Sequence, residues 1–213
     1  NLYRTDRRSQ ESIRIQPQPT PGESPERWNW DSPIMISPHD SDRLYFASQR
    51  LWRSPDRGDS WTAVSGDLTT NTNRYELPYM GRVWELDAMH DNGAMSQYAT
   101  LTTISESPIT EGLLYTGSDD GLIHSSTDGG HSWTRATPLP GVPERSFINK
   151  VEADLHSSGT VFALADAHKL GDYSPYVFES TDNGESWTSI RGDLPDGTIV
   201  WAMQQDHVSP DLL

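Results

Sequence analysis

The chain carries Ser54-Pro55-Asp56-Arg57-Gly58-Asp59-Ser60-Trp61, and the same pattern occurs twice more. The second copy is Ser126-Thr127-Asp128-Gly129-Gly130-His131-Ser132-Trp133, and the third is Ser180-Thr181-Asp182-Asn183-Gly184-Glu185-Ser186-Trp187. All three copies have Ser, Asp, Gly, Ser and Trp at the same five positions, and we call them octapeptides 1, 2 and 3. A motif that recurs within one chain indicates a repeat architecture.

The residue types of each octapeptide suit a tight reversal between two strands. Glycine supplies a backbone position with positive φ, which costs other residues energy. The Asp carboxylate can accept hydrogen bonds from the N–H groups of its own turn. We expect the Trp to pack back over its hairpin. Asp56, Asp128 and Asp182 could instead be catalytic or metal-binding, but one active site does not need three equivalent copies, which favours the structural role.

The segments around each octapeptide repeat as well. Short apolar runs precede each copy, such as 44–48 before octapeptide 1 and 160–164 before octapeptide 3. In the second copy, Asp119-Asp120-Gly121 separates two such runs, which is a hairpin signal. Each unit therefore predicts four short antiparallel strands with the octapeptide joining the third to the fourth. Repeats of this kind are the blades of an all-β propeller.

We expect blades at about 28–69, 100–140 and 147–195, and the start of another at 198–213. Residues 199–203 would begin its first strand, and Ser209-Pro210 would match the turns at Ser37-Pro38 and Ser107-Pro108. Residues 1–27 predict the end of a preceding blade followed by a Pro-rich linker. Closed propellers need at least about four blades, so the sequence predicts a fragment of a larger propeller whose remaining blades are its partners.

The spacing of the octapeptides locates two inserts. Asp56 and Asp128 are 72 residues apart and Asp128 and Asp182 are 54 apart, against roughly 40–45 for a plain blade. The large insert, 70–99, is rich in aromatic residues, and the small one spans 166–175. Long loops on a rigid scaffold often carry function, and aromatic rings dominate both protein hot spots and sugar stacking. Our candidate ligand contacts are Tyr75, Tyr79, Trp84, Tyr98 and Tyr173; alternatively, these rings only pin the insert to the propeller.

Composition narrows the class of protein. The 213 residues carry a net charge of −15 and no cysteine, which excludes disulfides, zinc fingers and thiol catalysis. An acidic chain repels nucleic acid and anionic lipid. The longest apolar runs are too short for a membrane span. The sequence has no phosphate-binding loop, nucleophile elbow or zinc-protease motif, and we expect no cofactor and no metal. His39 and His156 occupy equivalent turns, which favours a role in those turns over metal binding; His90 and His168 lie on or beside the inserts.

The octapeptide resembles the Asp-box of bacterial-neuraminidase-type (BNR) repeats. Residues 28–213 resemble the sortilin-type BNR repeat proteins, often labelled glycosyl hydrolase-like, on stretches such as 27–34, 103–108 and 171–178. The resemblance implies an exported β-propeller, extracellular or periplasmic and common in bacteria, and the sortilin members of the group bind peptides and proteins. From the repeated structural motif and the lack of a specific catalytic constellation, we expect a non-catalytic module that binds a protein, peptide or glycan. The cysteine-rich module of the sortilins has no match here, so receptor sorting is not implied.

The same resemblance leaves an enzyme as the alternative, because Asp-boxes also occur in sialidases and in xyloglucan-hydrolysing glycosidases. An inverting glycosidase needs two carboxyl groups roughly 6.5–9.5 Å apart. The acids expected on loops or on the first strands, which line the propeller channel, are Glu85, Asp87, Glu106, Glu152 and Asp154. No specific catalytic constellation emerges from them, and the catalytic residues stay unassigned.

Overall fold

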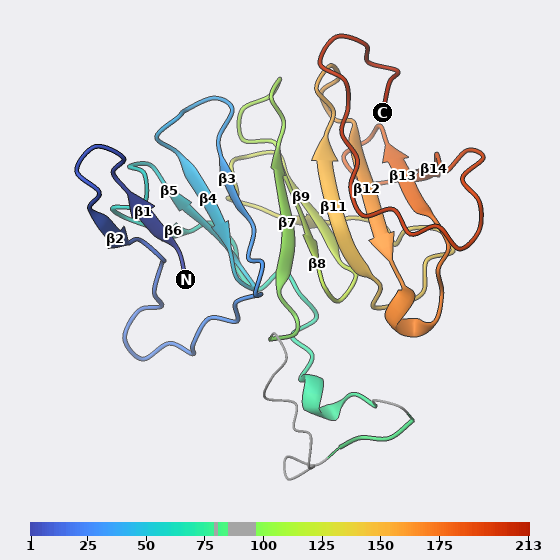
Figure 1. Ribbon diagram of the computed structural model, residues 1–213, viewed down its shortest axis with the longest axis horizontal. Helices are drawn as coiled ribbons and strands as arrows, with labels where there is room; N and C mark the ends of the chain where they lie inside the picture. The colour runs from blue at the N-terminus through green and yellow to red at the C-terminus, as the bar shows by residue number, and fades with distance from the viewer. Residues whose placement is uncertain (79–80, 85–96) are drawn as a thin grey trace.

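The computed structural model describes residues 1–78, 81–84 and 97–213. Within these residues, three four-stranded antiparallel sheets follow one another along the chain, and a two-stranded sheet precedes them (Figure 1). In each sheet every strand pairs with the next strand of the sequence. No helix in these ranges is long and apolar enough to cross a membrane.

The strand bounds follow the repeat. The two-stranded sheet contains β1 (Tyr3–Thr5) and β2 (Ser12–Arg14). Blade 1 contains β3 (Ile34–Ile36), β4 (Leu44–Ala47), β5 (Leu51–Ser54) and β6 (Thr62–Ala63). Blade 2 contains β7 (Leu101–Glu106), β8 (Leu114–Ser118), β9 (Ile123–Ser126) and β10 (Thr134–Arg135). Blade 3 contains β11 (Phe147–Ala153), β12 (Val161–Asp166), β13 (Tyr176–Ser180) and β14 (Thr188–Ser189).

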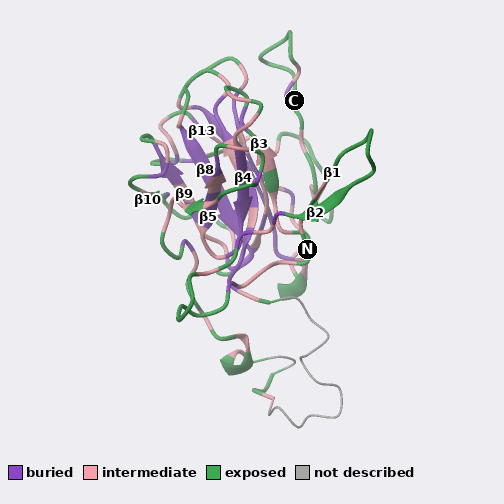
Figure 2. Ribbon diagram, turned by 90° about the vertical axis from the view of Figure 1, so that its left-hand side faces the viewer, coloured by how far each residue is buried: buried purple, intermediate pink, exposed green. Residues whose placement is uncertain are grey.

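This arrangement is a partial β-propeller with three blades, which confirms the predicted fold class. The blades pack face to face, and the buried residues lie between their sheets (Figure 2). One apolar cluster, which includes Tyr45, Leu51 and Leu101, joins blades 1 and 2. Another, which includes Tyr115 and Val161, joins blades 2 and 3. The core is therefore a series of interfaces between consecutive sheets.

The octapeptides join the third strand of each blade to the fourth, as predicted. In octapeptide 1 the Asp56 carboxylate accepts hydrogen bonds from the Ser60 N–H (2.8 Å) and the Ser60 hydroxyl (2.6 Å). The Gly58 N–H donates to the buried Ser54 hydroxyl at 2.7 Å. The same bonds recur in octapeptides 2 and 3. In all three, hydrogen bonds from the second Ser lower the pKa of the Asp to about 2.

The octapeptide tryptophans also contact the preceding unit, which the sequence did not predict. The Trp133 indole N–H donates to the carbonyl of Val64, at the end of blade 1, at 2.9 Å. The Trp187 indole donates to Thr137 of blade 2 at 3.1 Å, and the Trp61 indole donates to Ile15 at 2.6 Å. Because an indole has one donor and buried donors need partners, each tryptophan ties its blade to the preceding unit.

The octapeptide glycines also lie against the preceding unit: Gly58 and Gly130 meet the residues that the tryptophans bond, and Gly184 meets Ala136, next to Thr137. Gly58, Gly130 and Gly184 have φ of 94°, 93° and 92°. A Cβ on Gly130 would lie 2.8 Å from the Val64 carbonyl oxygen, and one on Gly58 would lie 2.6 Å from the Ile15 side chain. Glycine is therefore required twice, for the turn and for the close approach of the neighbouring unit.

The C-terminal residues differ from the expectation in two ways. Residues 199–203 form no strand, because within the described chain no second strand lies beside them to pair with. The turn register also differs. The Asp206 N–H donates to the Leu212 carbonyl just as the Ser37 N–H donates to Arg43 and the Ser107 N–H to Leu113. Asp206, and not Ser209, is therefore equivalent to Ser37.

We predict that Gly130→Ala destabilises the protein more than Gly141→Ala. Both glycines have positive φ, but a Cβ at Gly141 would meet nothing within 4 Å. Gly141→Ala should cost about 1 kcal/mol for the backbone conformation alone. Gly130→Ala should cost roughly 1–3 kcal/mol more, because the contact with blade 1 must open. Urea unfolding followed by tryptophan fluorescence measures both, and equal costs would show that the neighbouring blade imposes no constraint.

Candidate functional site

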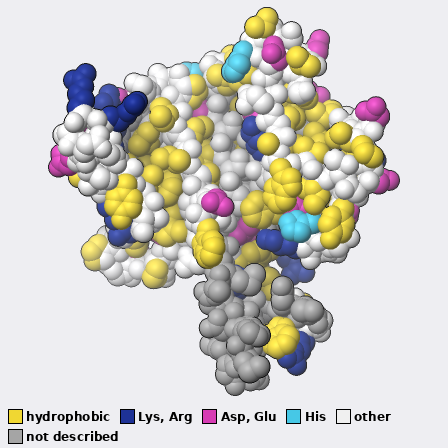
Figure 3. Space-filling view, viewed as in Figure 1, with side chains coloured by type: hydrophobic (Ala, Val, Ile, Leu, Met, Phe, Trp, Pro, Cys, Tyr) yellow, Lys and Arg dark blue, Asp and Glu magenta, His cyan; other side chains and the backbone are white. Residues whose placement is uncertain are grey.

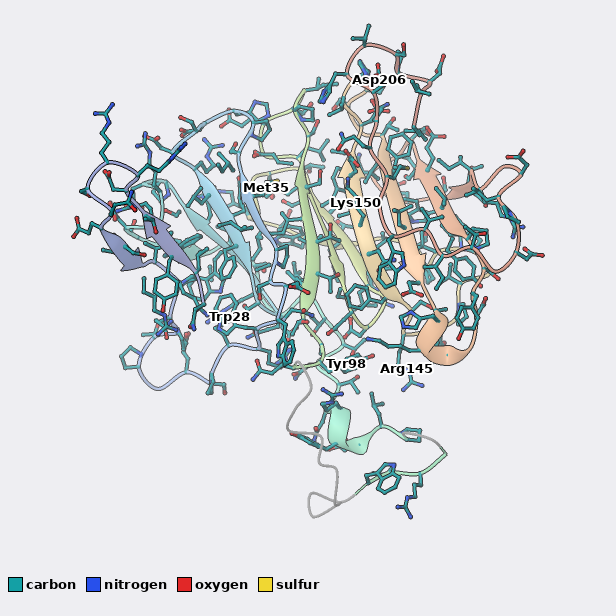
Figure 4. All side chains as sticks on the ribbon, viewed as in Figure 1. Trp28, Met35, Tyr98, Arg145, Lys150 and Asp206 are labelled. Atoms are coloured by element: carbon teal, nitrogen blue, oxygen red, sulfur yellow. The ribbon has the colours of Figure 1, made fainter. Side chains whose placement is uncertain are left out.

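One end of the propeller carries both inserts, and we call it the loop face. The connections between blades and the connections from second to third strands meet there, at the lower end of Figure 1. The turns from first to second strands and the octapeptides lie at the opposite end. Figure 4 shows Trp28, Tyr98 and Arg145 at the loop face and Asp206 at the other end.

Two adjacent carboxylates clamp the two ends of the large insert. Asp120 accepts hydrogen bonds from the Thr70 N–H (2.7 Å) and the Thr70 hydroxyl (2.6 Å). Asp119 accepts from the Thr100 N–H and the Thr100 hydroxyl, both at 2.8 Å. Both acids lie in the hairpin turn between β8 and β9 and are buried. The predicted hairpin is confirmed, and its side chains fix the base of the insert.

The connection that enters blade 1 reinforces this base. The Arg27 guanidinium donates to the Ala99 carbonyl at 3.1 Å and to the Asp67 carboxylate at 2.6 Å. The Trp28 N–H donates to the Gln97 side chain at 2.6 Å, and the Trp28 ring stacks on Phe46 with 4.8 Å between ring centroids. The β8–β9 turn and the connection before blade 1 therefore both hold the base of the insert.

The five predicted contact residues are divided by the structure. Tyr75, in the short turn η1 (Arg74–Glu76), and Tyr173, in the small insert, are exposed. Tyr98 is half-buried at the insert base, where burial and the neighbouring Asp120 and Asp119 raise its pKa to about 12. The Arg82 guanidinium lies 3.5 Å from the Trp84 ring centroid. Tyr79 lies outside the described residues. Tyr98 thus fits the pinning alternative, while Tyr75 and Tyr173 are accessible.

Two further aromatic residues on the loop face were not among the predicted contacts. Trp30 is 78% exposed and Trp201 is 61% exposed. Trp30 lies in the connection before blade 1, and Trp201 in the connection after blade 3. An aromatic residue in a connection between blades is the sequence signal that would identify both.

The small insert sets a histidine beside one of these rings. It contains the turn η3 (His168–Leu170). The buried Asp166 accepts hydrogen bonds from the His168 N–H at 2.8 Å and from its ring Nδ1. The His168 ring lies 5.9 Å from the Trp201 ring. Figure 3 shows a histidine, basic groups and hydrophobic side chains gathered at this part of the surface.

The predicted carboxylates do not form a catalytic pair in the described chain. Asp154 accepts from the His156 and Ser157 N–H groups, which caps a turn. Glu152 pairs with Lys150 at 2.6 Å. Glu106 accepts from the Gly112 N–H at 3.0 Å and its other oxygen, Oε2, is buried without a hydrogen-bond partner. Glu85 and Asp87, like His90, lie outside the described residues.

An open groove of about 520 Å³ lies between blades 1 and 2 at the end opposite the loop face. Its lining includes Arg43, Arg53, Tyr45 and Glu111. Arg43 lies 2.7 Å from Glu111 and 3.9 Å from Glu106, and the hydrogen bond with Glu111 raises the Arg43 pKa. One guanidinium therefore engages both carboxylates, and the groove lies away from the inserts.

The histidines and acids fit structural roles better than metal binding. His39 Nε2 is 2.8 Å from the Ser107 carbonyl and His156 Nε2 is 2.9 Å from the Asp206 carbonyl, so equivalent histidines contact the following unit. In the described ranges no three His, Asp or Glu side chains are grouped as metal ligands would be.

Comparison with known proteins supports the fold. No family model and no curated protein matches the sequence. Among solved structures, the chain is similar to an ancestral GH74 enzyme, with 18% identity and a TM-score of 0.51 over 81% of this chain and 19% of that enzyme. It is also similar to YCF48 bound to D1 peptide (14%, TM-score 0.43, 75% of this chain and 43% of that one). A third is Saccharomyces cerevisiae Sqt1, with 15% identity and a TM-score of 0.42 over 80% of this chain and 38% of that one.

The chain thus spans about a fifth of the GH74 enzyme's length (19%) and less than half of the other two. At 18% identity the GH74 likeness establishes the β-propeller fold and nothing finer.

We predict that Asp119→Asn stabilises the protein near neutral pH and has little effect near pH 4. Burial raises the Asp119 pKa to about 6 from 3.8, so this carboxyl holds its proton more tightly in the folded chain. Above pH 6, the buried charge of Asp119 lowers the free energy of unfolding. As the pH falls from 6 toward 4, Asp119 takes up its proton in the folded chain and this destabilisation disappears. Asparagine keeps an acceptor for Thr100 without the buried charge. The gain at pH 7.5 should reach about 3 kcal/mol at most.

Urea unfolding of both proteins over a pH series measures this difference. His124, whose pKa burial lowers to about 4, destabilises the folded chain as pH falls through the same range. Its effect cancels when the variant is compared with the parent. A difference that does not change between pH 4 and 7.5 would show that Asp119 is not a strained buried carboxyl.

Proposed function

We propose that this chain is part of a β-propeller interaction module that binds a protein, peptide or glycan at its loop face. One observation carries the proposal: both inserts and the exposed aromatic residues Trp30, Tyr75, Tyr173 and Trp201 belong to the same end of the propeller. Exposed rings of this kind supply large contact area at low entropic cost.

The support beneath these residues suits a binding surface. Asp119, Asp120 and Arg27 hold both ends of the large insert, and Asp166 orients the His168 ring. A surface whose base is already ordered loses less conformational entropy when a ligand binds. The acidic chain offers little attraction to nucleic acid, so we place protein, peptide and glycan ahead of it.

A second candidate is part of a propeller glycoside hydrolase of the xyloglucanase or sialidase kind. One observation favours it: the buried Glu106 has an oxygen without a hydrogen-bond partner, and Arg43 brings Glu111 close to it. We rank it second because Arg43 engages both carboxylates, whereas a glycosidase needs one carboxylic acid free to protonate the leaving group.

The resemblance to sortilin-type BNR repeat proteins supports two further parts of the proposal. An exported, extracellular or periplasmic location agrees with that resemblance. A role as one segment of a larger propeller, with the remaining blades as partners, also agrees with the resemblance. The octapeptide structure, with its Ser, Asp and Gly bonds repeated three times, is what an Asp-box needs to form its turn.

We predict that substitutions on the loop face weaken ligand binding while a matched substitution elsewhere does not. Glycans on a microarray and peptides from a displayed random library serve as probes for ligands of the parent chain. Tyr173→Ala and Trp201→Ala should each reduce the affinity of the selected ligands at least tenfold. Tyr3→Ala is the control, because Tyr3 is 56% exposed against 53% for Tyr173 but lies on the N-terminal hairpin.

Ligands whose affinity is unchanged in both loop-face variants would contradict the proposed site. Assays of the parent and of Glu106→Gln on xyloglucan, other β-glucans and sialosides separate the second candidate. Hydrolysis by the parent that is lost in Glu106→Gln would replace the binding module with the glycoside hydrolase.

A further inference from the structure

The N-terminal hairpin has the backbone geometry of the outer half of a blade. In each blade, the N–H just after the fourth strand donates to a carbonyl at the start of the third strand, as the Val64 N–H does to the Leu51 carbonyl. The Ile15 N–H donates to Leu2 in the same way. Blade 2 has the same bond between Ala136 and Ile123, and blade 3 has it between Ile190 and Val177. In all four pairs the donor and the acceptor are separated by the same number of residues in the sequence.

This hairpin also contacts blade 1 as one blade contacts the next. Its Ile15 receives the Trp61 indole bond and packs against Gly58. Arg4 donates to the Arg57 carbonyl at 2.9 Å, and Arg53 of blade 1 approaches the equivalent Gly129 carbonyl of blade 2 at 3.4 Å. The strands β1 and β2 therefore take the places of a third and a fourth strand, although the octapeptide residues are not conserved between them.

The inner half of the same interface is uncovered. Just after the first strand, the Ser37 N–H of blade 1 donates to the Arg43 carbonyl, and the Asp154 N–H of blade 3 donates to the Thr160 carbonyl in the same way. Counting back from these equivalent residues, Ile34 of blade 1 corresponds to Val151 of blade 3, and Ile36 corresponds to Ala153. Val151 and Ala153 are 1% and 2% exposed because the first and second strands of blade 2 cover them. Ile34 and Ile36 are 50% and 61% exposed. Among the described strands, β1 pairs only with β2, so its other edge is open as well.

We propose that the exposed face of β3 and the open edge of β1 together bind the first and second strands of a preceding blade. The occupant is a two-stranded antiparallel element whose second strand pairs with β1 and whose apolar side covers Ile34 and Ile36. The interface between blades 1 and 2 shows the chemistry required, because Met35, Tyr45 and Ala47 supply that apolar side there. An exposed strand edge beside apolar side chains is a site for strand addition.

A second copy of this chain does not fit the same place. The bond from Asp206 to Leu212 puts residues just before Asp206 at a first-strand position, and Lys150 and Asn149 of β11 bond to Met203 and Val200. No described residue occupies the adjacent second-strand position. Two copies joined end to end would therefore lack one strand of the shared blade.

Cysteine labelling tests the proposal, because the chain has no cysteine and Ile36→Cys introduces a single thiol. The added element is a second copy of residues 30–50, which contain the first and second strands of blade 1, placed directly before Leu2. In blade 1, residue 50 leads directly into Leu51, and Leu2 occupies the position in the N-terminal hairpin that Leu51 occupies in blade 1. We expect this addition to slow the reaction of the Ile36→Cys thiol with a maleimide at least tenfold. Ile109→Cys, at a position 47% exposed in a turn of blade 2, should react equally with and without it.

A matched added element with aspartate at the copied Met35 and Ala47 positions should give no protection. This comparison does not depend on the added strands folding alone, since the chain from Leu2 onward is the same in each protein. Equal labelling of Ile36→Cys with and without the apolar element would overturn the proposal. So would slow labelling in the unextended chain that becomes faster on dilution, because a second copy would then occupy the face.

Discussion

The contact between each octapeptide and the unit before it is the constraint on which the rest of the structure depends. A tryptophan indole donates to a carbonyl of the preceding unit, and the octapeptide glycine lets that unit approach without a Cβ in the way. The contact occurs at all three octapeptides. Each one fixes a hairpin tip against a neighbour, which is how sheets with fourth strands of only two residues keep a defined packing.

The two ends of the propeller carry different kinds of residue. The octapeptides and first-to-second-strand turns carry the contacts between units, including those of His39 and His156. The loop face carries the inserts, held by buried carboxylates of blade 2 and by Arg27. The contacts made by the octapeptides and histidines thus gather at one end, while the other end presents aromatic side chains to solvent.

Local chemistry made the hairpins predictable, and long-range packing limited the rest. The Ser-Asp-Gly spacing predicts each turn because its hydrogen bonds join residues two to four positions apart. The tryptophan partners were not predictable, since Val64 and Trp133 are far apart in sequence. At the insert base, Asp119 and Asp120 were predicted only as a hairpin turn, because nothing local shows that their side chains reach Thr100 and Thr70.

The candidate site was predictable to the level of segments. Insert lengths identified the two loops, but exposure separated Tyr173 from Tyr98, and exposure depends on packing. Trp30 and Trp201 were missed because they lie in ordinary connections between blades. The C-terminal register was wrong for a related reason: the Ser-Pro dipeptide looked like the earlier turns, while the backbone bonds place Asp206 there.

Hydrogen exchange of the indole N–H groups tests the central contact most directly. Two-dimensional NMR resolves the tryptophan indoles of the folded chain, and exchange into D₂O is followed for each. We expect Trp61, Trp133 and Trp187 to exchange only as fast as the whole protein unfolds, and the exposed Trp30 and Trp201 to exchange at once. Octapeptide indoles that exchange as fast as Trp30 would contradict the account, because the bond to the preceding unit would then not hold the blades together.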